Sequence, residues 1–422
     1  MPMSEGFQSR LIPRLKEIAN HYGTPFHIYD EEGIRRTCRE FRALSEKLPF
    51  KQYYAVKSLP NPHILKILFE EGMGFDCASV PELRLARLAG ASGEELFFTS
   101  NNTQPDEFEA ARSAGAIINL DDTCFLDTLR PFPELACFRM AAGDLDRNCS
   151  FMGDAMGSKF GVPHARLADA YRRARDLGAT RFGLHAMLCS NQLSSAGALE
   201  LSTLVLERAA HLRDSLGIHF EFVNIGGGIG IPYRPGDAVF DFAAFAEGII
   251  RAHARYFDTR TSIFTECGRY VTGPHGVLVT GVTNVMHKFR THIGVDSGMS
   301  ALIRPAIYPD AYHHITLPFV DKAPITADVV GSLCENNDKF AIQRLLPAPE
   351  RGDLMIVHDT GAHGAAMGMT YNGRLKPKEL LLKADGTVSL IRKAETTDDY
   401  LSTISMIENF EVPEAKVNRY AS

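Results

Sequence analysis

Eight short apolar segments alternate with amphipathic stretches between residues 52 and 268, and this alternation most constrains the fold. The apolar segments have the length of strands, whereas the stretches between them repeat apolar positions at the three- and four-residue spacing of a helix. Eight strands alternating with helices predict a (β/α)₈ barrel. A doubly wound open sheet is the alternative, but it more often has about five to seven strands and an early glycine-rich turn. The predicted strands are 52–57, 74–78, 96–100, 117–121, 136–141, 181–188, 220–225 and 262–266.

The rest of the chain has a different pattern. Residues 275–422 contain apolar runs separated by turn residues and few long helical stretches, which predicts a β-rich barrel domain. The segment 25–29 precedes the barrel and is predicted to be a strand that joins this second domain. We therefore expect three parts: an N-terminal segment over 1–30, an α/β barrel over 31–274 and the β-rich domain over 275–422.

Composition excludes several classes of protein. The chain has 422 residues, of which 45% are apolar and 23% charged, and this suits a globular protein of two domains. A formal charge of -6 gives no reason to expect nucleic acid or an anionic membrane as partner. No signal peptide and no apolar run of about 20 residues is present. The eight cysteines are scattered without a C-x-x-C pair, which predicts a cytoplasmic protein without a zinc site.

The ends of the predicted strands carry reactive side chains, and barrel active sites lie at the C-terminal ends of their strands. Lys57 ends the first strand, where we expect burial to lower the pKa of its amine. Such an amine can attack a carbonyl and hold it as a Schiff base, although an isolated lysine at this place more often reaches for water. The other residues expected at this rim are Asp76, Asn101, Asn102, His185, Met187, Ser190, Gly226–Gly230, Glu266, Gly268 and Arg269.

Each of these residues also has a purely structural interpretation. The glycine run at 226 follows the seventh strand, where barrels commonly bind phosphate, but such a run is often only a tight turn. The structural alternative for Asp76 is a cap on the next helix, and for Glu266 with Arg269 it is a salt bridge. A reactive lysine, a phosphate-binding loop and a carboxylate at one rim together suit pyridoxal phosphate.

The motifs together resemble one enzyme family. The chain is similar to the fold-type III, alanine-racemase-like group of pyridoxal-phosphate enzymes, and within it to the diaminopimelate, ornithine and arginine decarboxylases, diaminopimelate decarboxylase above all. The resemblance covers about residues 20 to 405. The motifs that carry it are Tyr54-Ala55-Val56-Lys57, Phe75-Asp76-Cys77-Ala78-Ser79, Gly157-Ser158-Lys159-Phe160-Gly161, the glycine run at 226, Glu266-x-Gly-Arg269, Cys334-Glu335 and Tyr371-Asn372.

This resemblance implies roles for the rim residues. Lys57 would bind the cofactor covalently, and Glu266 would face the pyridine nitrogen and keep it protonated. The ring would then accept the electrons left after CO₂ departs. The racemases of the group place an arginine there, so Glu266 favours decarboxylation over racemisation. The remaining cofactor contacts implied are Asp76, Ser190, Gly226, Gly227, Gly228, Gly268, Arg269 and Tyr371.

The second domain would complete the site. By the same resemblance, Cys334 would be the acid that reprotonates Cα, and Glu335 would bind the distal amine of the substrate. Both would enter the active site of the partner subunit in a head-to-tail homodimer, while Asp338 nearby could equally be a turn residue. Arg304 with Tyr308 resembles the segment that binds the distal carboxylate of diaminopimelate, with Tyr371 as a further substrate contact. The alternative for Arg304 is a surface arginine beside a turn-forming proline.

Four positions depart from the family pattern. Met187 occupies the place of an imidazole that stacks on the cofactor, Cys189 replaces a glycine, Cys267 a proline, and His363 a tyrosine. The function predicted is decarboxylation at a D-configured carbon of a diamino acid, with meso-diaminopimelate converted to L-lysine and CO₂. Because of Met187, D-ornithine or D-lysine is the alternative substrate. A racemase and a non-catalytic cofactor-binding protein are the hypotheses from other classes.

Overall fold

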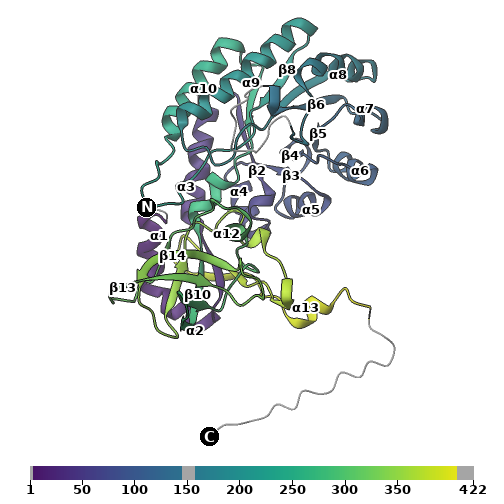
Figure 1. Ribbon diagram of the computed structural model, residues 1–422. Coiled ribbons are helices and arrows are strands. Elements are labelled where there is room, and N and C mark those ends of the chain that lie inside the picture. The colour runs from purple at the N-terminus through teal and green to yellow at the C-terminus, as the bar shows by residue number, and fades with distance from the viewer. Residues whose placement is uncertain (1–2, 145–156, 406–422) are drawn as a thin grey trace.

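The computed structural model describes residues 3–144 and 157–405, and its larger part is a closed barrel of eight parallel strands. This confirms the predicted (β/α)₈ barrel, which lies above a mostly β second domain in Figure 1. Every predicted barrel strand is present, although most of them end one or two residues earlier than expected. The barrel strands are β2 (Phe50–Ala55), β3 (Gly74–Cys77), β4 (Leu96–Phe98), β5 (Ile117–Leu120), β6 (Leu135–Met140), β7 (Arg181–Ala186), β8 (Phe220–Asn224) and β9 (Ser262–Thr265).

Helices cover the outside of the barrel, because the amphipathic stretches have one apolar face to bury against the strands. Local signals fix where they begin and end. Ser79 caps α5 by accepting the Glu82 N–H group, and Gly217 ends α9 in the left-handed conformation. The helices in this part of the chain are α3 (Glu31–Arg42), α4 (Pro62–Glu70), α5 (Val80–Leu88), α6 (Pro105–Ser113), α7 (Phe125–Thr128), α8 (His164–Asp176), α9 (Ser195–Leu216), α10 (Phe242–Tyr256) and α11 (Arg269–Thr272).

The barrel interior is filled mainly by aromatic side chains. Tyr53, Phe97 and Phe222 are buried together with the inward-facing residues of neighbouring strands. The Tyr53 ring meets that of Phe97 edge-on at 5.5 Å, and Phe97 meets Phe222 in the same way at 5.9 Å. The barrel is therefore a packed core, and ligands have access only at its ends.

The second domain is mostly strand, as predicted, and forms a nine-stranded mixed sheet. The strand expected at 25–29 is β1, which pairs antiparallel with β10 and parallel with β16. Two short helices near the N-terminus pack on this sheet through Phe7, Leu11, Leu15 and Ile18. The elements are α1 (Glu5–Leu11), α2 (Leu15–Tyr22), β1 (Phe26–Asp30), β10 (Gly276–His287), β11 (Thr291–Val295), α12 (Arg304–Ile307), β12 (Ile315–Thr316), β13 (Pro324–Val330), β14 (Lys339–Pro347), β15 (Leu354–Val357), β16 (Lys378–Leu382), β17 (Val388–Arg392) and α13 (Thr397–Leu401).

We propose the division 1–30, 31–274 and 275–422 as the domain organisation, since β1 belongs to the sheet that follows the barrel in sequence. Within the described residues, no helix is long and apolar enough to cross a membrane. The same residues hold no cluster of histidine, cysteine or acidic side chains that could bind a metal ion. Cys149 lies outside the described residues.

Candidate active site

A cavity opens where the barrel strands end, and its walls come from the ends of seven of the eight strands and the loops after them. Many of the predicted rim residues line it, and they meet although they lie far apart in sequence. Asn101 and Asn102 are not among them, because the chain turns away after Thr99, which takes the predicted place after β4. The predicted residues that line the cavity are Lys57, Asp76, His185, Met187, Ser190, Gly228, Glu266, Gly268, Arg269 and His363.

Lys57 lies one turn beyond the end of its strand. β2 ends at Ala55, and residues Val56–Ser58 form a 3₁₀ turn that brings Lys57 to the cavity wall. Its side chain is exposed, so the expectation of a buried amine at a strand end was wrong. The reason is the early end of β2, which lets the turn direct the side chain into the opening rather than between strands.

Two carboxylates face Lys57 from the cavity floor. Asp76 ends β3 and is 5% exposed, and its Oδ1 atom has no hydrogen-bond partner among the described residues. Burial, together with the nearby charge of Glu266, raises the pKa of Asp76 well above its ordinary value. Asp76 does not cap α5, because Ser79 does. Its free oxygen is therefore available to a group bound in the cavity.

Glu266 follows β9 and is held from two sides. Its Oε2 atom lies 2.9 Å from His185 Nε2, and its Oε1 atom accepts a hydrogen bond of 2.7 Å from the Asn224 amide. Although burial opposes ionisation, the neighbouring His185 and Lys57 keep the pKa of Glu266 below its ordinary value. The pair with Arg269 considered from the sequence is not formed. The pKa values of the two carboxylates in this cavity are thus shifted in opposite directions.

The glycine run after β8 approaches the ends of β7 and β9 backbone to backbone. Gly226 and Gly228 have φ angles of +71° and +100°, and a Cβ atom at Gly228 would lie 2.5 Å from the Cys189 carbonyl oxygen. The Gly226 N–H group donates to Asn224 Oδ1, and that of Gly227 donates to Met187 Sδ at 3.2 Å. Of the three predicted phosphate-binding glycines, only Gly228 lines the cavity.

Sequence reasoning missed Arg139 and Thr99, which also line the cavity. Arg139 lies near the end of β6, 8% exposed, and is paired with Asp121 at 3.4 Å. Its guanidinium lies 4.4 Å from the ring centroid of Phe160, which belongs to the motif at 157–161. Both residues could have been predicted, because the active-site residues of a barrel lie at the C-terminal ends of its strands.

Arg304, predicted to bind the substrate, begins α12 in the second domain and is only 8% exposed. Its Nη1 atom is 3.5 Å from His313 Nε2, and its guanidinium lies 4.7 Å from the ring centroid of Tyr233. Burial lowers the pKa of Arg304. Among the described residues, no carboxylate lies within ion-pair distance of it. Tyr308 is half exposed, 5.9 Å from the same guanidinium.

Cys334, Glu335 and Tyr371 do not line this cavity. The Cys334 N–H group donates to Asn372 Oδ1 at 2.7 Å, so the Cys334 loop and the turn at Tyr371 lie together on the second domain. All three side chains are exposed. Asp338 accepts the N–H groups of Met299 and Leu333 at 2.7 and 2.9 Å and therefore shapes the loop.

His363 reaches the cavity where Tyr371 does not. Its N–H group donates to the Ser58 carbonyl at 2.8 Å, which holds it beside the Lys57 turn. Burial, and then the positive charge of Arg269, lowers the pKa of His363 well below its ordinary value. A neutral imidazole thus stands among three cationic side chains, those of Lys57, Arg269 and Arg304.

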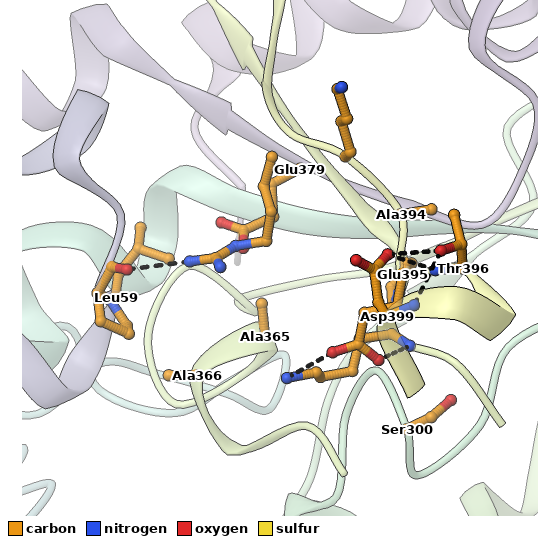
Figure 2. A pocket seen from close by; sticks show the side chains of 14 residues that line it. Leu59, Ser300, Ala365, Ala366, Glu379, Ala394, Glu395, Thr396 and Asp399 are labelled. Carbon is orange, nitrogen blue, oxygen red and sulfur yellow. Dashed lines mark hydrogen bonds and ion pairs between the residues drawn. The ribbon is translucent and has the colours of Figure 1, made fainter. Parts of the chain in front are cut away.

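A larger cavity, of about 770 Å³, lies between Leu59 and the last strand and helix of the second domain (Figure 2). Four of its charged side chains are paired with one another: Lys376 with Glu395 at 2.9 Å, and Arg392 with Glu379. No reactive group of the barrel rim reaches it. The smaller cavity at the barrel mouth is therefore the candidate active site.

Comparison with known proteins gives the family. The fold and the rim define a pyridoxal-phosphate enzyme, and the family model of the pyridoxal-dependent decarboxylases, pyridoxal-binding domain, matches residues 32–273. The chain belongs to this family of decarboxylases.

Two relatives and one solved structure show how far the likeness extends. Protein TabA of Pseudomonas amygdali pv. tabaci is 50% identical over 406 residues, 96% of each chain. The diaminopimelate decarboxylase of Methanothermobacter thermautotrophicus is 34% identical over 399 residues, covering 91% of this chain and 92% of the relative. The structure of Helicobacter pylori diaminopimelate decarboxylase complexed with L-lysine matches with a TM-score of 0.85 at 27% identity, covering 92% of this chain and 98% of that one.

The residues at the barrel mouth fit pyridoxal phosphate, the cofactor of this family. Lys57 supplies an amine on the cavity wall, and Asp76 has a buried oxygen without a partner in the described structure. Gly228 and Arg269 both line the cavity, so a phosphate would meet a backbone without a Cβ atom and a positive charge. An aldehyde, a ring nitrogen and a phosphate each find a complementary group.

Proposed function

We propose that the protein decarboxylates meso-diaminopimelate at its D-configured carbon and so forms L-lysine and CO₂. The observation that carries this proposal is Arg304, a buried guanidinium with no carboxylate partner among the described residues. Burying an unpaired charge is costly, so such a group is kept where a ligand supplies the opposite charge. A distal carboxylate is the part of diaminopimelate that D-lysine and D-ornithine lack.

The neighbours of Arg304 support this assignment. Burial lowers the pKa of His313 to about 3, so this imidazole is neutral. His313 Nδ1 lies 2.8 Å from the His358 carbonyl and donates to it, which leaves Nε2 as an acceptor for Arg304. His313 Nε2 lies 3.5 Å from Arg304 Nη1 and the Tyr233 ring lies 4.7 Å from the guanidinium, and we assign the remaining N–H groups of Arg304 to a substrate carboxylate, which can accept two hydrogen bonds from a guanidinium.

We assign the roles at the barrel mouth as follows. Lys57 binds the cofactor, and Arg269 with Gly228 holds its phosphate. Once bound, the cofactor accepts the electrons released when the substrate loses CO₂. Glu266 keeps a negative charge at the ring nitrogen, oriented by His185 and Asn224, and so holds a proton there. Asp76, in its protonated form, donates a hydrogen bond from its unpartnered Oδ1 atom to a group bound in the cavity.

Cys334 and Glu335 are proposed to act in a neighbouring subunit. Both are exposed on the second domain, and neither lines the cavity of its own chain. A head-to-tail homodimer would bring them to the partner's barrel mouth, where Cys334 returns a proton to Cα and Glu335 binds the distal amine. Tyr371, half exposed beside Cys334, would move to the partner's site with them.

The alternative substrates are D-ornithine and D-lysine. One observation favours them: Met187, not an imidazole, lines the cavity. CO₂ release from meso-diaminopimelate, D-lysine, D-ornithine and their L-forms decides between the substrates. We expect release from meso-diaminopimelate above all others. Release from the diamines alone would overturn the proposal and leave Arg304 without a substrate group to bind.

A further inference from the structure

Tyr233 lies between two arginines that come from different domains. It follows the glycine run in the loop after β8 and is only 6% exposed. Its phenolic oxygen accepts a hydrogen bond from Nη1 of Arg269, the first residue of α11. The guanidinium of Arg304, the first residue of α12, lies 4.7 Å from the centroid of its ring.

The two arginines need such a neighbour. No carboxylate pairs with either of them in the part of the chain that the structure describes, and the positive charge of Arg269 acts on Arg304. An aromatic face attracts a guanidinium, and a phenolic oxygen accepts from one, without the charge that a carboxylate would bring. Tyr233 therefore holds both cations in place and leaves their charges for ligands.

We propose that Tyr233 is a positioning residue that sets Arg269 for the cofactor phosphate and Arg304 for the distal carboxylate of the substrate. The role of Tyr233 toward Arg304 rests on the proposed function, whereas its role toward Arg269 does not. Arg269 donates to the phenolic oxygen and lies 5.6 Å from the ring centroid, whereas Arg304 lies nearer the ring, at 4.7 Å, so the oxygen acts mainly on Arg269 and the ring mainly on Arg304. Tyr233 itself does not line the cavity, so it acts through the arginines.

Two substitutions separate the effect of the phenolic oxygen from that of the ring. Tyr233→Phe removes the oxygen and keeps the ring, whereas Tyr233→Leu removes both. The dissociation constant for pyridoxal phosphate is measured by fluorescence titration of the full chain, and KM and kcat for meso-diaminopimelate at saturating cofactor. For Tyr233→Phe we expect the cofactor constant to rise about tenfold, the worth of one hydrogen bond to a charged group, with KM within twofold. For Tyr233→Leu we expect KM to rise as well, by about three- to tenfold, with kcat little changed.

Tyr312 provides the matched control. Its ring also carries two arginines, Arg344 at 3.8 Å and Arg234 at 5.0 Å, but neither of them lines the cavity, whereas Arg269 does. Tyr312→Phe and Tyr312→Leu should leave both constants unchanged. The positioning role is wrong if Tyr233→Phe raises KM as much as it raises the cofactor dissociation constant. It is also wrong if neither Tyr233 variant changes either constant. If the wild type does not act on diaminopimelate, the role of Tyr233 toward Arg304 fails together with the proposed function. The cofactor dissociation constant of Tyr233→Phe still tests the role toward Arg269.

Discussion

Replacing Arg304 with methionine tests the substrate assignment most directly, because methionine keeps much of the length and removes only the charged fork. A hydrogen bond to a charged group contributes about 1.5–3 kcal/mol, so losing the carboxylate contact should raise KM for meso-diaminopimelate roughly 10- to 100-fold. D-lysine has no distal carboxylate, so its KM, or its inhibition constant if it is only bound, should change less than threefold.

The structure also predicts what this substitution does to stability. Arg304 is 8% exposed, with its charge desolvated and no ion pair to break among the described residues. Its replacement relieves the cost of burying a charge and loses a contact with the Tyr233 ring that contributes about 0.5–2 kcal/mol. These effects oppose each other, so the melting temperature should shift by only a few degrees.

The control for Arg304→Met is Arg234→Met. Arg234 also rests on a tyrosine ring, that of Tyr312 at 5.0 Å, but it is exposed and donates to the Asp310 carbonyl. Steady-state CO₂ release gives KM and kcat for both variants. An Arg304→Met protein with unchanged KM for diaminopimelate, or with equal losses for diaminopimelate and D-lysine, would refute the reasoning.

Three further predictions follow from the same geometry. Glu266→Gln should lower kcat about a hundredfold or more while the cofactor constant changes far less, because glutamine cannot hold the ring proton by charge; an unchanged kcat would leave Glu266 a structural residue. Lys57→Ala and Cys334→Ala should each be inactive alone, and mixing them should restore activity, because some mixed dimers carry one intact site; no recovery after verified subunit exchange contradicts the shared site. Stability should fall as the pH drops below 6.5, by roughly 1.4 kcal/mol per pH unit for each histidine that stays neutral in the fold and is protonated when unfolded. Burial is the main cause of these depressed pKa values, and a chemical denaturation series from pH 7 to 4.5 measures the slope. The histidines are His27, with a pKa of about 4, and His275, His313 and His358, with pKa values of about 3.

The barrel could be predicted because each of its strands is a short, buried, nearly continuous apolar run. The N-terminal helices could not be predicted from such runs, since their buried residues are single positions. Phe7, Leu11, Leu15 and Ile18 repeat at three- and four-residue spacing, but Pro13 interrupts the helical stretch. Their apolar stripe becomes apparent only against the sheet that it covers.

The site residues that lie at the ends of barrel strands could be predicted from the sequence. Lys57, Asp76 and Glu266 converge because they follow neighbouring strands in a closed barrel. Whether Lys57 would be buried depended on where β2 ends, which local sequence fixes only to within a residue or two. Tyr233 lies in a loop without periodicity, and its contact with Arg304 exists only because two domains meet there.

Three of the four departures from the family pattern, Met187, Cys189 and Cys267, lie on the cofactor side of the cavity. Met187 Sδ accepts the Gly227 N–H group at 3.2 Å, and a Cβ atom at Gly228 would lie 2.6 Å from Cys189 Sγ. A Cβ atom at Gly227 would lie 3.5 Å from the Cα atom of Cys267. Three unusual residues therefore contact one glycine loop, and we interpret them as a joint repacking of that loop. Arg304 lies at the start of α12, in the second domain. A changed binding site for the cofactor is therefore compatible with an unchanged binding site for a distal carboxylate.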